Sequence, residues 1–157
     1  MEIKKGARII SIIAIISTII SLYMVYLHYS PEPSEFCNFW ENLNCDVVNK
    51  SEWSELFGIP VALLGFLTFL AIFILNLFIL RDKKEFSGFD LTQKRIIILQ
   101  LIILIWSIIY SYGFLLLYVE YYKLSGIYCP LCLLLDIIIL LMFIIALLMY
   151  LEVKNAR

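Results

Sequence analysis

The sequence predicts an all-α membrane protein, a bundle of four transmembrane helices in a single domain over residues 1–157. Hydrophobic residues make up 63% of the chain and charged residues 16%, whereas soluble domains are only about 45–50% apolar. Uninterrupted apolar stretches cover residues 9–29, 58–80, 96–119 and 131–151. Each is close to the roughly 20 residues that a helix needs to cross hydrocarbon. We therefore expect four membrane spans.

The first apolar stretch is expected to stay in the protein as a membrane anchor. Lys4, Lys5 and Arg8 precede it, as basic residues also precede the core of a secretory signal. A signal core has only about 7–15 apolar residues and ends at a cleavage site of small residues. Residues 9–29 form a longer stretch and run on without such a site. This length favours a retained span over a cleaved signal.

Lysine and arginine outside the four stretches are distributed unevenly. Cytoplasmic segments of membrane proteins retain positive charge, and ten basic residues lie in the N-terminal segment, the 81–95 connection and the C-terminal tail, against two elsewhere. The ten are Lys4, Lys5, Arg8, Arg81, Lys83, Lys84, Lys94, Arg95, Lys154 and Arg157, and the two are Lys50 and Lys123. We expect a multi-pass plasma-membrane protein with both termini cytoplasmic and the loops at residues 30–57 and 120–128 outside. The charges form no patch typical of nucleic-acid binding.

All four cysteines fall on the predicted outer side, where disulfides persist. Cys37 and Cys45 lie in a polar loop, and Cys129 and Cys132 open the last span as a C-x-x-C motif. This spacing brings the two sulfurs within bonding reach across one helical turn. The positive end of the helix dipole favours a thiolate there, and Pro130 suits the first turn, where its missing N–H is not needed. The pattern indicates a reactive dithiol beside a mobile cysteine pair.

Three interpretations of the cysteines remain open. Two pairs could bind zinc through four thiolates, but the outer compartment, the single His28 and the lack of a second short C-x-x-C disfavour it, and no metal is expected. Two permanent disulfides in a non-enzymatic membrane scaffold would also satisfy the spacing. A redox relay is favoured, because a C-x-x-C at the mouth of a membrane helix is poorly explained as a structural disulfide.

The loop sequence SEWSELFG at residues 51–58 predicts a short interfacial helix. Trp53, Leu56 and Phe57 stand at i, i+3 and i+4, which places them on one apolar stripe, with Glu52 and Glu55 elsewhere. Tryptophan is enriched at the membrane–water interface, where such a helix lies flat. Ordinary loop packing is the alternative.

The order of these features resembles the vitamin K epoxide reductase (VKOR) family. The matching segments are CNFWENLNC at 37–45, DVVNKSEWSELFGIP at 46–60 and YCPLC at 128–132. They contain the loop cysteine pair, Ser51 six positions after the second loop cysteine, Trp53, the Phe57–Gly58 pair and the C-x-x-C. The DsbB-like quinone-linked oxidases are the main alternative. They carry a C-x-x-C in the first outer loop and a spaced pair in the second, the reverse of the order here.

The resemblance implies a quinone-dependent thiol-disulfide oxidoreductase that generates disulfides on the outer face. Electrons would pass from a thioredoxin-like protein to Cys37 and Cys45, then to Cys129, and from Cys132 to a quinone of the ubiquinone, menaquinone or vitamin K type. Ser51 would lie close to the reacting atoms. The quinone contacts expected on the same basis are Trp53, Ser54, Phe57, Leu117 and Asp136.

The sequence departs from animal members of this family at two positions. Asp136 stands four residues beyond the second C-x-x-C cysteine, where those enzymes have tyrosine, and Ser54 stands where they have asparagine. Both positions concern the substrate's oxygen atoms, so the resemblance leaves epoxide reduction open. The chain also ends at residue 157 without a fused thioredoxin-like domain. The redox partner is therefore expected to be a separate protein on the outer face.

Asp136 lies at i+4 from Cys132 and i+7 from Cys129, so the three share one helical face. An ionisable residue inside a span is costly and is by default a functional hypothesis. We expect a role near the quinone, either donating a hydrogen bond or relaying a proton. The alternative is helix packing, with three conceivable partners, Ser107, Ser111 and Tyr112.

Overall fold

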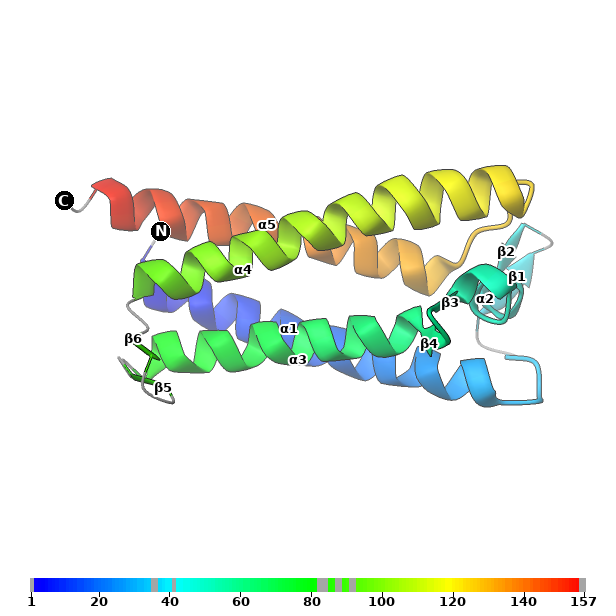
Figure 1. The fold of residues 1–157 in the computed structure, drawn as a ribbon, viewed down its shortest axis with the longest axis horizontal. Helices are drawn as coiled ribbons and strands as arrows, with labels where there is room; N and C mark the ends of the chain where they lie inside the picture. Colours follow the sequence, from blue (N-terminus) through cyan, green and yellow to red (C-terminus); the bar gives the residue numbers. More distant parts are fainter. Residues whose placement is uncertain are drawn as a thin grey trace.

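The computed structural model describes residues 2–34, 37–40, 42–81, 85–86, 89–90 and 93–155. Long helices run along one axis and form an elongated bundle (Figure 1). They are α1 (Ile3–Tyr29), α3 (Val61–Leu80), α4 (Gln93–Ile108), which continues as the π-helix η2 (Ile109–Lys123), and α5 (Pro130–Asn155). With α4 and η2 counted as one, all four are long and apolar enough to cross a membrane. The predicted fold class is confirmed.

Short elements occupy two of the connections. Between α1 and α3 lie β1 (Asn38–Trp40), β2 (Leu43–Asn44), α2 (Cys45–Asn49), the 3-10 helix η1 (Glu52–Ser54), β3 (Glu55–Leu56) and β4 (Ile59–Pro60). Between α3 and α4 lie β5 (Glu85–Phe86) and β6 (Phe89–Asp90). The strands pair as three antiparallel hairpins, β1 with β2, β3 with β4 and β5 with β6.

Helix α1 packs most extensively against α3, and α4 packs against α5. The buried residues of α1 recur every three or four positions and are mostly small: Gly6, Ala7, Ile10, Ser11, Ala14, Ser17, Ser21, Met24 and Leu27. Small residues let helix backbones approach closely, and this packing replaces the hydrophobic effect as the driving force within lipid. Larger apolar side chains such as Ile12, Ile19 and Ile102 point outward. They match the surface expected of lipid-facing helices.

A buried polar pair joins α3 to α4. The side-chain amide of Asn76 donates to the Oε1 atom of Gln100 over 3.2 Å and to the carbonyl of Ile72 over 2.8 Å. Both amide side chains are fully buried. An interhelical bond of this kind contributes on the order of 1 kcal/mol in a membrane, so the pair fixes the register of the two helices.

The two ends of the bundle differ in content. Both chain termini and the β5–β6 hairpin lie at one end, whereas β1, β2, α2 and the start of α5 lie at the other (Figure 1). We call the second end the cysteine end, because Cys45 begins α2 and Cys129 directly precedes α5. Three of the basic residues on which the predicted orientation depends lie outside the described residues: Lys83, Lys84 and Arg157.

The segment predicted as a short interfacial helix is helical for only one turn. Trp53 lies in η1, but Leu56 belongs to β3, and the chain reverses at Phe57 and Gly58. Both turn residues have positive φ, 55° and 78°, as a two-residue hairpin turn of type I′ requires. The predicted apolar stripe of Trp53, Leu56 and Phe57 therefore does not form, because the glycine permits a hairpin that ends the helix.

Candidate functional site

The cysteine loop is joined to the start of α5 by a short parallel bridge between Leu43 and Tyr128. The amide of Asn44 donates to the carbonyl of Tyr128 over 2.9 Å, and the amide of Tyr128 donates to the carbonyl of Asn42 over 2.9 Å. One residue beyond each strand segment, the chain reaches Cys45 on one side and Cys129 on the other. Residues 84 apart in sequence are brought together by this pairing.

Helix α2 holds Cys45 in place within the loop. The side chain of Asn44 caps this helix by accepting the amide of Val47 over 3.0 Å, which satisfies one of the free amides at a helix start. One carboxylate oxygen of Asp46 accepts the amide of Ser34 over 2.7 Å and the side chain of Asn38 over 2.5 Å. Asp46 thus ties the start of α2 to both sides of Cys37.

Electrostatics keep Asp46 ionised at this position. Burial raises the pKa of the Asp46 carboxyl, but hydrogen bonds from Ser34 and Asn38 and the nearby ammonium of Lys50 outweigh it, so the pKa lies below its ordinary value of 3.8. The Lys50 Nζ atom is 3.0 Å from the second carboxylate oxygen. The loop is therefore organised around a charged acceptor.

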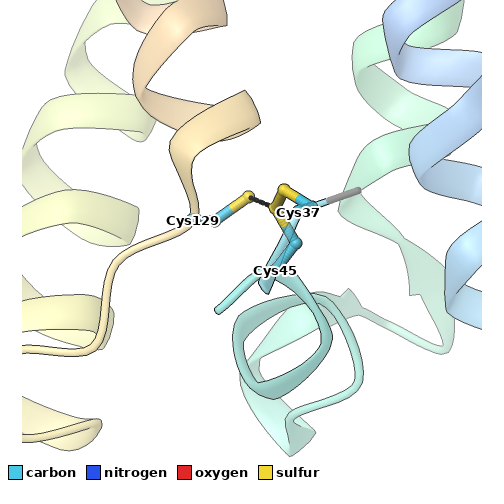
Figure 2. A group of neighbouring side chains, drawn as sticks. All are labelled: Cys37, Cys45 and Cys129. Atoms are coloured by element: carbon cyan, nitrogen blue, oxygen red, sulfur yellow. Dashed lines mark hydrogen bonds between the residues drawn. A yellow bond between two sulfur atoms is a disulfide. The ribbon is translucent and has the colours of Figure 1, made fainter. Parts of the chain in front are cut away.

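Three sulfurs meet at the cysteine end. Cys37 and Cys45 form a disulfide, and the Sγ of the free Cys129 lies 3.2 Å from the Sγ of Cys45 (Figure 2). All three side chains are buried, in an apolar cluster that includes Met24 and Leu27. A thiol at this distance from a disulfide sulfur is placed for exchange.

Cys129 occupies the N-cap position of α5. The carbonyl of Cys129 accepts the amide of Leu133 over 3.0 Å, the first bond of the helix, and its Sγ accepts the amide of Cys132 over 3.2 Å. This is the hydrogen bond that an N-cap side chain makes, here with sulfur as acceptor. The amide of Cys132 thus points at this sulfur from the first turn of the helix. Pro130 fits the first turn, where no amide donor is lost.

A metal could use the same three sulfurs only in another redox state. The Sγ atoms of Cys37, Cys45 and Cys129 lie within 4.8 Å of one another. Thiolates are the form of cysteine that binds metal, and two of these sulfurs are bonded to each other. In this structure the three sulfurs, which we call the sulfur cluster, are therefore not arranged as a set of thiolate ligands.

A cavity of about 520 Å³ adjoins the sulfur cluster and reaches into the bundle. Residues of α1, α2, η1, α3, α4, η2 and α5 line it, and most of the lining is apolar. Cys132 lines this cavity, whereas Cys129 faces the loop disulfide. The two cysteines of the motif therefore lie in different surroundings, Cys129 beside the loop disulfide and Cys132 at the cavity.

A few polar groups of η2 and α5 interrupt the apolar lining. The hydroxyl of Ser111 donates to the Oδ1 atom of Asp136. Ser111 is one of the three partners that the sequence analysis considered for Asp136. Glu120 is only 2% exposed, and its Oε1 atom accepts the amide of Cys129 over 3.3 Å. The Oε2 atom of Glu120 and the hydroxyl of Tyr110 are buried without a hydrogen-bond partner among the described residues. All four residues belong to the cavity lining.

Apart from Cys37, Cys45 and Cys129, the predicted site residues divide into two groups. Trp53, Ser54 and Asp136 line the cavity together with Cys132. Three others do not line it: Ser51, Phe57 and Leu117.

The local structure around each of these three residues explains why it lies outside the cavity lining. The hydroxyl of Ser51 donates to the carbonyl of Val48 over 2.8 Å. Phe57 is 96% exposed because it forms the tip of the β3–β4 hairpin. Leu117 is 62% exposed because the π-helical register of η2 turns it away from the bundle.

Glu120 and Tyr110 were not among the predicted residues. The apolar stretch at 96–119 ends just before Glu120, so the sequence placed this residue in the outer loop. The helix in fact continues to Lys123, which carries Glu120 back over the start of α5. A single acidic residue directly after a long apolar stretch was the available signal.

Comparison with protein families places most of this chain in a known family. The model described as "Vitamin K epoxide reductase family" matches residues 8–147. This range includes all four cysteines, the loop between α1 and α3, and most of each membrane helix. The chain therefore belongs to the vitamin K epoxide reductase family of membrane thiol-disulfide oxidoreductases.

Proposed function

We propose that this protein oxidises the thiols of a separate thioredoxin-like protein at the cysteine end and transfers the electrons to a membrane quinone. One observation carries this proposal: Cys129 contacts the loop disulfide while Cys132 lines the cavity. A C-x-x-C pair divided in this way can receive electrons on one side and release them on the other. A pair of structural disulfides would have no use for the free thiol beside Cys45.

Transfer between the pairs follows from the sulfur geometry. The Cys45 thiolate attacks Cys129 in an oxidised Cys129–Cys132 pair, so the Cys45–Cys129 bond forms and Cys132 leaves with the electron pair. Cys37 then attacks Cys45 and Cys129 leaves. The products are a Cys37–Cys45 disulfide and a free Cys129 beside it, the arrangement present in this structure. Each step is thiolate exchange through a mixed disulfide.

The thioredoxin-like partner acts on the loop disulfide. Its thiolate attacks the Cys37–Cys45 bond, and resolution of the mixed disulfide leaves the partner oxidised and the loop pair reduced. Cys37 belongs to the loop rather than to a membrane helix. The loop is therefore the segment that we assign to the exchange with a water-soluble protein.

The cavity has the properties that a quinone requires. Its volume of about 520 Å³ lies within the usual range of about 300–1,000 Å³ for small-molecule sites. The lining is mainly apolar, and Tyr110, Ser111 and Asp136 supply polar groups suited to carbonyl oxygens. When bound, a quinone supplies the oxidising power, since it takes up two electrons and two protons. The residues that we assign to hold it are these three with Trp53 and Ser54.

We assign the cysteine end to the outer side of the plasma membrane. Both termini share the opposite end with the β5–β6 hairpin (Figure 1), and among the described residues the segments at that end contain seven of the nine basic side chains. In a variant with all four cysteines replaced by serine, a membrane-impermeant thiol reagent should modify Trp40→Cys, at an exposed position of the loop, in intact cells. Protection of this cysteine until the cells are lysed would reverse the assignment.

Quinone turnover by the purified protein tests the function. With a reduced thioredoxin-like protein as donor, wild-type protein should reduce a short-chain ubiquinone or menaquinone. Replacing Cys45, Cys129 or Cys132 with serine should abolish turnover. Oxidation of the donor without quinone reduction, or turnover that survives the Cys132→Ser substitution, would exclude the proposed route.

A further inference from the structure

The side chain of Glu120 is a buried acidic group that the exchange steps above do not use. It lies near the end of η2 and is 2% exposed. One oxygen, Oε1, accepts the amide of Cys129 over 3.3 Å. The other, Oε2, has no hydrogen-bond partner among the described residues. Glu120 therefore contacts the C-x-x-C motif with one oxygen and keeps the other free.

Among the described residues, the cavity lining contains no basic side chain that would neutralise Glu120. Among the described residues, the titratable groups lining it are Tyr110 and Glu120 on η2 and Cys132 and Asp136 on α5. The lining residues of α1, α2, η1, α3 and α4 carry no ionisable group. A carboxyl group kept in a membrane span without a charged partner is costly, and such residues mark proton and ion pathways.

Asp136 differs from Glu120 in its hydrogen bonding. Its Oδ1 atom accepts the hydroxyl of Ser111, so part of its capacity is spent on joining α5 to η2. The Oε2 atom of Glu120 has no hydrogen-bond partner among the described residues, and its Oε1 atom contacts a cysteine of the motif. Of the two cavity carboxyl groups, Glu120 is the better placed to exchange protons with the cysteine pair.

We propose that Glu120 is the proton-carrying residue of the Cys129–Cys132 pair. The inference rests on the proposed quinone-linked function. Oε1 holds the backbone of Cys129, and Oε2 accepts protons from the thiols and passes them to the quinone in the cavity. When the Cys129–Cys132 bond forms, two thiols give up two electrons and two protons, and the quinone gains both. Glu120 binds and releases one proton at a time and ends in its starting state.

The Glu120→Gln variant separates proton transfer from positioning. Glutamine keeps a carbonyl oxygen for the Cys129 amide but cannot carry a proton. Reconstituted protein is supplied with dithiothreitol and a short-chain ubiquinone, and turnover is measured as a function of pH. In parallel, a Cys37→Ser, Cys132→Ser background measures the yield of the Cys45–Cys129 disulfide with and without Glu120→Gln. Glu52→Gln, at an exposed carboxyl in the loop between α1 and α3, is the control for loss of a carboxyl group outside the cavity.

We expect Glu120→Gln to lower turnover by about 100-fold, the usual contribution of a positioned acid–base group, and to flatten the acidic limb of the pH profile. The Cys45–Cys129 yield should remain that of the parent. Wild-type turnover and pH profile in Glu120→Gln would overturn the inference, as would an equal loss of the disulfide yield, because the residue would then act only on structure. A wild-type protein that reduces no quinone would instead overturn the proposed function, and this inference with it.

Discussion

The Sγ of Cys129 lies 3.2 Å from the Sγ of Cys45, although the two residues are 84 positions apart. Their contact depends on the bridge between Leu43 and Tyr128, which aligns the loop with the start of α5. Neither cysteine needs a large rearrangement to exchange with the other. The loop pair and the C-x-x-C pair are in this sense one centre.

The contact predicts which mixed disulfide forms most readily. In a Cys37→Ser, Cys132→Ser double variant, Cys45 and Cys129 remain and should link almost completely on mild oxidation, because no backbone movement is required. In the matched Cys37→Ser, Cys129→Ser variant, Cys45 and Cys132 should link poorly, since Cys132 faces the cavity. Mass spectrometry of peptides from non-reduced protein measures both yields. Equal linkage to Cys132 would contradict the geometry.

Asp46 predicts a loss of stability in acid. Its pKa in the folded protein lies below the ordinary value of 3.8, so the unfolded chain binds the proton first as the pH falls. The stabilisation is fully present above about pH 4 and is lost as the pH falls through the lowered pKa. We expect Asp46→Asn to lower the free energy of unfolding by about 1–3 kcal/mol at neutral pH and to have little effect in strong acid.

Thermal unfolding in detergent at several pH values measures this difference, with Glu52→Gln as the control for loss of a loop carboxylate. If the difference between wild type and Asp46→Asn stayed constant from neutral pH to strong acid, Asp46 would not be the acid-sensitive group.

Asp136 predicts a difference between two substitutions. Asp136→Asn keeps a group that can donate a hydrogen bond into the cavity, whereas Asp136→Leu does not. We expect the leucine variant to lose about 100-fold in quinone turnover, comparable with removal of one oriented donor in other enzymes, and the asparagine variant to bind quinone better than the leucine variant. Turnover per folded molecule is the measurement. Wild-type turnover in the leucine variant would leave only the packing role with Ser111.

Lys123 predicts an effect on access to the cavity. Its Nζ lies 5.1 Å from the ring centre of Trp53 and 5.5 Å from that of Tyr118, and the two rings meet edge to face at 5.8 Å. These contacts fasten η1 to η2 beside the cavity. A cation–π contact of this kind is worth about 0.5–1 kcal/mol, so Lys123→Met should raise the quinone KM about two- to fivefold with kcat unchanged.

Lys154→Met, at the opposite end of the bundle, is the control for loss of one positive charge. A KM that is unchanged in Lys123→Met would show that Trp53 is held by its other contacts.

Periodicity predicted the parts of the site that lie on one regular helix. Cys132 and Asp136, four positions apart on the regular helix α5, both line the cavity, and Ser111 was among the partners foreseen for Asp136. The family resemblance predicted quinone contacts for Trp53 and Ser54; both residues line the cavity, and their contact with a quinone stays a prediction. In these cases the sequence pattern and the local backbone agree.

The remaining site residues depend on backbone features that hydrophobic pattern does not encode. η2 has the wider π-helical register from Ile109 to Lys123, so an α-helical period of 3.6 residues does not describe which of its residues share a face. In the π-helical register Leu117 points outward and Glu120 contacts Cys129. Phe57 lies in the β3–β4 turn and not in the predicted helix, because its positive φ and that of Gly58 form a hairpin. The Leu43–Tyr128 bridge joins two short segments without a distinctive sequence pattern.

The most direct test adds one equivalent of quinone to fully reduced protein and maps the disulfides that form. The account predicts that the oxidising equivalent enters at Cys132, passes through the Cys45–Cys129 bond and ends as a Cys37–Cys45 disulfide, with Cys129 and Cys132 free. In a Cys45→Ser variant the equivalent should stop as a Cys129–Cys132 disulfide. Oxidation of Cys37 and Cys45 by quinone in a Cys132→Ser variant, or no disulfide after one equivalent in the wild type, would contradict the account.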